Sequence, residues 1–84
     1  ANVFALEIVT PDKTFYNGNA EMIVIRILKR IEYIKNHRPL VAGLATGTLR
    51  IKLDGKFKDA KVSGGFMNVD KEKTVIVTES AEWI

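Results

Sequence analysis

Short segments of the chain alternate large apolar residues with polar or small ones, and turn-forming residues separate these segments. In residues 3–10 the large apolar side chains stand at Phe4, Leu6 and Ile8, and from Leu49 to Leu53 they again occupy every second position. A period of two places successive side chains on opposite faces of a β-strand. Both segments are therefore predicted to be strands with one buried face.

The same pattern predicts further strands at residues 14–16, 21–27, 56–63, 66–69 and 74–78. Thr-Pro-Asp-Lys at 10–13, Asn-Gly-Asn at 17–19 and Asp-Gly at 54–55 provide turn chemistry between them. Short strands with a turn about every eight to twelve residues are typical of a β-sandwich or barrel. The side chains expected to face between two sheets are Phe4, Leu6, Ile8, Leu49, Ile51, Val75 and Val77.

Residues 23–35 fit two structures. Their apolar residues fall on a helical stripe, at Ile23, Val24, Ile27, Leu28, Ile31 and Ile34, with basic residues off it. A strand, a turn and a strand would also fit, but no Gly, Pro, Asn or Asp stands between Arg26 and Lys35 to form the turn. From the pattern alone, both the helix and the strand pair stay open.

Composition predicts one small folded domain over residues 1–84, because 46% of the chain is hydrophobic and 27% charged. The absence of cysteine excludes disulfides, and the apolar runs are far shorter than the ~18 residues of a membrane span, so membrane insertion is not expected. The net charge is +3, and basic residues gather in two groups, Arg26, Lys29, Arg30, Lys35 and Arg38, and Lys52, Lys56, Lys58 and Lys61. These groups form either a solvated face or a patch for an acidic partner, and the excess is too small to favour nucleic acid.

Residue types give no support for catalysis. His37 is the only histidine, Ser63 lies in Ser-Gly-Gly rather than in a nucleophile elbow, and a zinc site needs more ligands than one histidine supplies. No phosphate-binding glycine motif occurs. We expect no catalytic, cofactor or metal site, and we interpret Gly64 and Gly65 as residues needed for backbone geometry.

Several blocks together resemble the N-terminal domain of the epsilon subunit of the rotary F-type ATP synthase. They are L-E-I-V-T-P-D at 6–12, E-M-I-V-I at 21–25, N-H-R-P-L at 36–40, G-T-L-R-I at 47–51, S-G-G-F-M-N-V at 63–69 and T-V-I-V-T at 74–78, with A-E-W at 81–83. The most specific are the H-x-P-L and S-G-G-F blocks, in this order and at this spacing. The resemblance runs through most of the chain.

The resemblance implies an all-β, flattened sandwich of about ten short strands, and it favours the strand pair over helical distortion at residues 23–35. It also implies a non-catalytic rotor module of a proton- or sodium-driven synthase, peripheral at the cytoplasmic face of the bacterial plasma membrane. The implied gamma-subunit interface comprises Thr10, His37, Arg38, Pro39 and Ala42, which would lie together on one exposed side. The loop implied to face the c-ring comprises Leu28, Lys29, Arg30, Ile31 and Glu32.

Two features depart from the family pattern. The family has an acidic, glycine-rich turn before the H-x-P-L block, whereas residues 28–33 here are one residue shorter and basic, which disfavours contact with basic ring loops. The family also continues beyond A-E-W into a two-helix hairpin that these 84 residues do not contain. The alternative function is a basic surface-binding module, in which residues 23–35 form an amphipathic helix for a membrane surface or a partner protein.

Overall fold

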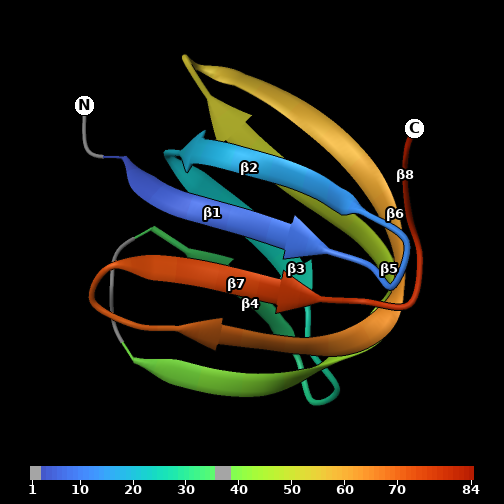
Figure 1. Cartoon of the computed structure of the whole chain (residues 1–84). Helices are drawn as coiled ribbons and strands as arrows, with labels where there is room; N and C mark the ends of the chain where they lie inside the picture. The colour runs from blue at the N-terminus through green and yellow to red at the C-terminus, as the bar shows by residue number, and fades with distance from the viewer. Residues whose placement is uncertain (1–2, 36–38) are drawn as a thin grey trace.

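The structure, a computed structural model, describes residues 3–35 and 39–84, and every regular element in these ranges is a strand (Figure 1). The strands are β1 (Phe4–Val9), β2 (Thr14–Ala20), β3 (Met22–Arg26), β4 (Ile31–Ile34), β5 (Leu40–Leu53), β6 (Lys56–Val69), β7 (Lys73–Val77) and β8 (Ala81–Trp83). The all-β prediction is confirmed.

Two long strands, β5 and β6, connect the two layers of the sandwich. They form an antiparallel hairpin from Leu40–Val69 to Leu53–Lys56, and both curve around one side of the molecule from one layer into the other (Figure 1). In the first layer β7 pairs with Phe66–Val69 of β6, and β1 and β2 follow outward in the order β2-β1-β7-β6-β5. In the second layer β8 pairs with Ala60–Val62 of β6, while β3 pairs with β5 at Arg50–Lys52 and β4 lies at the edge.

The described strands number eight, whereas the resemblance implied about ten. The difference arises because β5 and β6 are each 14 residues long and contribute a segment to both layers. Each would be counted as two short strands if divided at the bend. The sandwich architecture is therefore the expected one, built from fewer and longer strands.

The bend of the hairpin lies at Gly64 and Gly65, opposite Leu44 and Ala45. The ladder between β5 and β6 lacks a pair at Ala45 and Gly64, and both glycines have positive φ, 83° and 113°. A Cβ atom on Gly65 would lie 1.9 Å from the carbonyl oxygen of Val77, which no side chain can tolerate. The backbone of β6 therefore crosses closely over the end of β7 at the point where it leaves the first layer.

The core follows the predicted alternation in most strands but not in β7. Phe4, Leu6, Ile8, Leu49 and Ile51 are buried between the layers, as predicted. The prediction was wrong for Val75 and Val77, because Thr74, Ile76 and Thr78 point inward instead and Val77 is 39% exposed. The segment T-V-I-V-T is β-branched at every position, so its periodicity does not identify the inner face. The inner face is set by parallel pairing with β1, which places Thr74 beside Leu6 and Ile76 beside Ile8.

Residues 23–35 form a strand hairpin, so the helical alternative is wrong. Ile23, Ile25 and Ile27 are buried, which is the period of a strand. The turn is closed by the Ile27 amide, which donates to the carbonyl of Arg30 at 2.8 Å, and the Leu28 amide donates to the carbonyl of Gly43 at 3.0 Å. Pairing with β5 thus overrides the local helical preference, and tertiary hydrogen bonds replace the missing turn residues.

Truncating the core should cost far more stability than truncating the outer face of β7. Ile51→Ala removes a side chain that is buried between the layers and should lower the free energy of unfolding by about 2–5 kcal/mol. Val77→Ala removes partly exposed atoms and should cost less than about 1 kcal/mol. Denaturant unfolding measures both values, and equal losses would contradict the assigned register.

The bend requires a glycine at position 65 but not at position 47. Gly65→Ala places a methyl group against the Val77 carbonyl at a positive φ, so we expect a loss of several kcal/mol or no folding. Gly47→Ala is the matched control, because a Cβ there meets nothing within 4 Å and no left-handed φ is needed. Thermal unfolding of both variants tests this, and a Gly65→Ala domain as stable as the control would show that the bend is wrongly placed.

Candidate protein-interaction surfaces

The outer face of the first layer carries an apolar strip formed by Val9, Val77, Phe66 and Val41. Val9 lies opposite Val77 and Val77 opposite Phe66, while Phe66 faces Gly43 on β5, two residues from Val41. Val41 is 76% exposed and Phe66 58% exposed. The strip crosses four neighbouring strands, β1, β7, β6 and β5, with aliphatic and aromatic side chains where a solvated sheet would carry polar ones. Such a face is suited to bind another protein.

The turn between β3 and β4 lies beside the end of this strip and forms a groove with the start of β5. The groove has a volume of about 300 Å³ and is lined by Ile27, Leu28, Lys29, Arg30, Leu40, Val41, Ala42 and Gly43. Leu28 lies over Gly43, since a Cβ on Gly43 would be 2.8 Å from Leu28 Cδ1. Ile27 forms a bridge to Leu44, so the tip of a hairpin from the second layer is fixed against the first.

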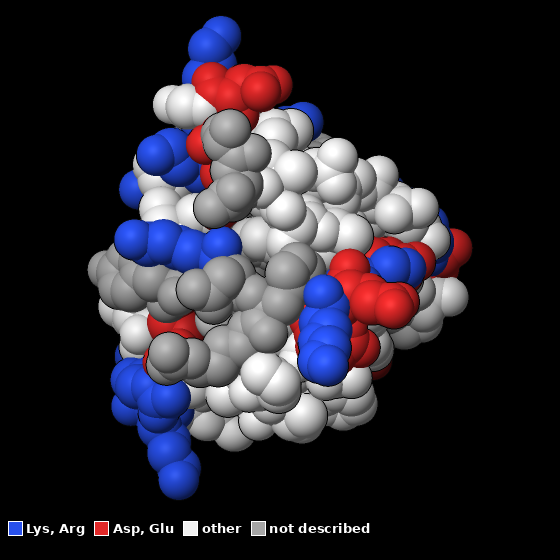
Figure 2. Space-filling view, turned by 90° about the vertical axis from the view of Figure 1, so that its left-hand side faces the viewer, with Lys and Arg blue, Asp and Glu red and all other residues white. Residues whose placement is uncertain are grey.

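The outer face of the second layer is charged. Arg50 forms an ion pair with Asp59 at 3.0 Å, and its guanidinium lies 4.2 Å from the ring centre of Phe57. The Lys52 ammonium approaches the same ring at 5.9 Å. In a view from the side, Figure 2 shows Lys and Arg side chains mainly down the left of the molecule, with others at the top and beside acidic side chains on the right, around an uncharged area. The charges on the outer face of the second layer are partly paired with one another, so this face is less suited to bind a partner.

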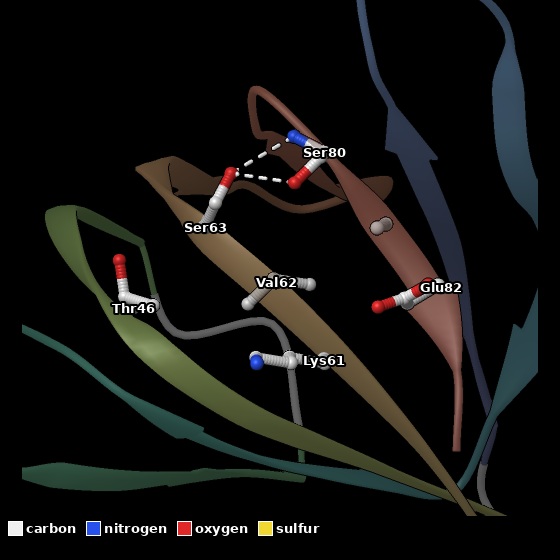
Figure 3. Close-up of a pocket in the computed structure, with 7 residues that line it drawn as sticks. Thr46, Lys61, Val62, Ser63, Ser80 and Glu82 are labelled. Atoms are coloured by element: carbon white, nitrogen blue, oxygen red, sulfur yellow. Dashed lines mark hydrogen bonds between the residues drawn. The ribbon is translucent and has the colours of Figure 1, made fainter.

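A second pocket, of about 290 Å³, lies where β6 meets β8, and polar side chains line most of it (Figure 3). Ser63 Oγ accepts hydrogen bonds from the Ser80 amide at 2.9 Å and from the Ser80 hydroxyl at 3.0 Å. The Ser63 amide donates to Ser80 O at 3.2 Å and to Thr78 Oγ1 at 3.3 Å. These bonds hold the β7–β8 connection against β6. Ser63 is therefore a structural residue in this pocket.

An aromatic cluster closes the edge of the sandwich between β2 and β8. The rings of Phe15 and Trp83 lie 4.4 Å apart, and the Lys58 ammonium lies 4.1 Å from the Trp83 ring centre. Tyr16 packs edge-on against the same Trp83, and its hydroxyl donates to the carbonyl of Asn19 at 2.7 Å. Partial burial raises the pKa of Tyr16 above its usual value, so its hydroxyl stays protonated and keeps this bond. The cluster therefore stabilises the fold by packing β2 against β8.

The three predicted gamma-interface residues that the structure describes, Thr10, Pro39 and Ala42, do not lie together on one exposed side. Thr10 follows the end of β1, and its hydroxyl donates a hydrogen bond to the carbonyl of Lys13 in the same turn. Pro39 is exposed and directly precedes β5, at the opposite end of the sheet. Ala42 packs against the core, so its prediction as an outward residue was wrong. Its neighbours Val41 and Gly43 face outward instead, because alternation along β5 points Leu40, Ala42 and Leu44 inward. His37 and Arg38 lie outside the described residues.

The loop predicted to face the c-ring is the exposed tip of the β3–β4 hairpin. Leu28, Lys29, Arg30 and Ile31 are exposed, and Glu32 forms an ion pair with Arg30, whose Nε lies 2.5 Å from the carboxylate.

Within the described part of the chain, no group of three or more potential ligands could hold a metal ion. No helix in that part is long and apolar enough to cross a membrane.

Sequence reasoning missed the apolar strip. A signal for it was present, because Leu40 to Leu44 and Val75 to Val77 are apolar at both alternating sets of positions. A sandwich strand with one solvated face should be polar at one of the two sets. Where both sets are apolar, the outer set is expected to be covered by something else.

Comparison with known proteins identifies the family of this fold. The family model of the ATP synthase delta/epsilon chain β-sandwich domain matches residues 3–84. This chain belongs to that family. The ATP synthase epsilon chain of Alkaliphilus oremlandii is 44% identical over 99% of this chain and 63% of its own length, and that of Brevibacillus brevis is 46% identical over 92% and 60%. The chain therefore spans about three fifths of the length of these relatives.

Solved structures of ATP synthases contain the same fold. One chain of the Euglena gracilis mitochondrial enzyme, in a cryo-EM structure of its OSCP, F1 and c-ring, matches 95% of this chain with 52% of its own length. Its TM-score is 0.87 and its sequence identity 25%. A chain in the central stalk and c-ring structure of the Tetrahymena thermophila mitochondrial enzyme matches with a TM-score of 0.78 at 18% identity, which supports the fold alone.

The serine pair should contribute to stability unequally. Ser63→Ala removes the oxygen that accepts two hydrogen bonds from Ser80, so it should lower the free energy of unfolding by about 1–2 kcal/mol. Ser80→Ala removes one of these bonds and should cost about half as much. Denaturant unfolding of both variants gives the comparison. A Ser80→Ala variant less stable than Ser63→Ala would show that the bonds are wrongly assigned.

Proposed function

We propose that this domain is a non-catalytic rotor module of ATP synthase, which docks on the gamma subunit and the c-ring and helps couple ion flow to ATP synthesis. Membership of the delta/epsilon β-sandwich family supports this role. The main observation in support of this role is the apolar strip, because exposing such a face to water is unfavourable and docking on a partner would bury it. The domain would thus serve a peripheral complex at the cytoplasmic face of a bacterial membrane.

The gamma contact is best assigned to the outer face of the first layer. The strip offers Phe66, which is exposed and central, as an anchor of the kind that dominates protein interfaces. Thr10 lies beyond the end of β1, next to the strip at Val9, and is retained as a rim residue. Pro39, which is exposed where β5 begins, is retained in the proposed contact together with His37 and Arg38, and Val41 replaces Ala42 as the contacting side chain.

The c-ring contact is assigned to the tip of the β3–β4 hairpin. The tip carries Lys29 and Arg30 where the family carries glycine and acid, so ring loops that are themselves basic would be repelled. Salt would screen much of this repulsion, because both side chains are exposed. We therefore infer weaker contact with a basic ring than an acidic turn would give. The alternative of a membrane-binding amphipathic helix is not retained, since these residues form strands.

Replacing Phe66 should impair gamma binding without unfolding the domain. Phe66→Asp puts a charge at the centre of the strip, so we expect the dissociation constant for the gamma subunit to rise at least about tenfold. Phe57→Asp is the matched control, because Phe57 is an exposed aromatic residue on the outer face of the second layer. It should change the constant less than about twofold.

Titration of purified gamma subunit with each variant, alongside its circular dichroism spectrum, makes the comparison. If Phe57→Asp weakens binding as much as Phe66→Asp while both stay folded, the gamma-binding face is not the apolar strip. If neither binds differently from the unmodified domain, docking uses neither outer face.

A further inference from the structure

The groove between the β3–β4 turn and the start of β5 combines an apolar interior with a basic rim. Ile27, Leu28, Leu40 and Val41 supply the apolar lining, and Lys29 and Arg30 stand at the tip beside them. Its volume of about 300 Å³ lies at the lower end of the range found for ligand pockets. The groove is therefore large enough to take an anchor residue together with part of the backbone that carries it.

The shape of the groove is fixed by backbone contacts. The Leu28 amide donates to the carbonyl of Gly43, the Ile27 amide donates to the carbonyl of Arg30, and Ile27 forms a bridge to Leu44. Leu28 then extends sideways across Gly43, where the missing Cβ leaves space for it. Although 73% exposed, Leu28 forms a wall of the groove and does not project forward from the tip.

The electrostatics of the groove select for an anion. Glu32 is the only acid among residues 26–35, which also contain Arg26, Lys29, Arg30 and Lys35. Its carboxylate is already held by Arg30. Lys29 has no carboxylate within the hairpin left to pair with, and Arg30 keeps guanidinium donors beyond the one used at Nε. A negative group on a ligand would meet both cations at the rim.

We propose that this groove binds an acidic peptide segment of a partner protein, with one aliphatic side chain held in the groove and an adjacent carboxylate at Lys29 and Arg30. The site shares Lys29 and Arg30 with the tip assigned to the c-ring and Val41 with the strip assigned to gamma, but peptide binding to the isolated domain depends on neither assignment. A concave, apolar-lined groove suits a side chain better than a lipid surface, because membrane-binding segments project a convex apolar face. The groove adjoins the apolar strip through Val41, so an occupied groove would extend that surface.

Two blocked peptides test the proposal on the full 84-residue chain labelled with nitrogen-15. The first has the sequence GLDEIG and the second, matched in its apolar residues, has GLKKIG. We expect the acidic peptide to shift the amide signals of residues 27–30 and 40–43 in a saturable way. The basic peptide should bind at least about fivefold more weakly, and 0.5 M NaCl should weaken the acidic peptide severalfold.

Variants separate the contribution of the apolar lining to peptide binding from that of the basic rim. Lys29→Glu should raise the dissociation constant of the acidic peptide about fivefold or more, and Val41→Ala should raise it without changing its salt dependence. Lys56→Glu is the control, because it makes the same charge change at an exposed position near the β5–β6 turn. Both lysines and Val41 are exposed, so these variants are expected to fold.

The proposal is overturned if the basic peptide binds as tightly as the acidic one, or if Lys56→Glu weakens binding as much as Lys29→Glu. It is also overturned if the acidic peptide causes no saturable shifts at millimolar concentration, or if the shifts map to other residues. Vesicles of 30% phosphatidylserine provide the remaining comparison. If they perturb residues 27–30 and the peptide does not, the tip recognises a lipid surface instead. All of these experiments use the domain without the gamma subunit, so none of the results depends on whether that subunit binds the strip.

Discussion

The bend in the β5–β6 hairpin is the constraint on which the rest of this domain depends. One hairpin supplies the centre of both layers, so the chain needs a sharp change of direction in the middle of a 14-residue strand. Gly64 and Gly65 provide it with positive φ, and the close approach of Gly65 to Val77 fixes where β7 ends. Without that crossing, β7 and β8 could not pair with the same strand in different layers.

This arrangement gives the two layers different outer faces. The first layer is assembled from β1, β2, β7, the start of β5 and the end of β6. Its strip of Val9, Val77, Phe66 and Val41 exists only because β1, β7, β6 and β5 become neighbours. The second layer shows the paired charges of Arg50 and Asp59 around Phe57. A domain with one apolar and one charged face can bind a partner on one side and stay solvated on the other.

The strands with strict alternation could be predicted from sequence, as could the turn at Asp54 and Gly55, where both residues adopt positive φ. The inner face of β7 could not, because all five residues from Thr74 to Thr78 are β-branched and only pairing with β1 separates the faces. The β3–β4 turn has no turn-forming residue. The bond from Ile27 to Arg30 closes it, and a hydrogen bond from Leu28 to Gly43, which is distant in sequence, holds it against β5. For the same reason the direction of Ala42 and the existence of the groove could not be predicted from local pattern.

The central claim is that the first layer, through its apolar strip, is the face that meets the rest of the rotor. Hydroxyl-radical footprinting of the domain, alone and bound to the gamma subunit, tests it most directly, since it measures side-chain exposure residue by residue. Phe66 and Phe57 are exposed aromatic residues on opposite outer faces, and Trp83 lies at the edge. The account predicts that binding strongly reduces oxidation of Phe66 and leaves Phe57 and Trp83 unchanged. Protection of Phe57 with unchanged oxidation of Phe66 would contradict it.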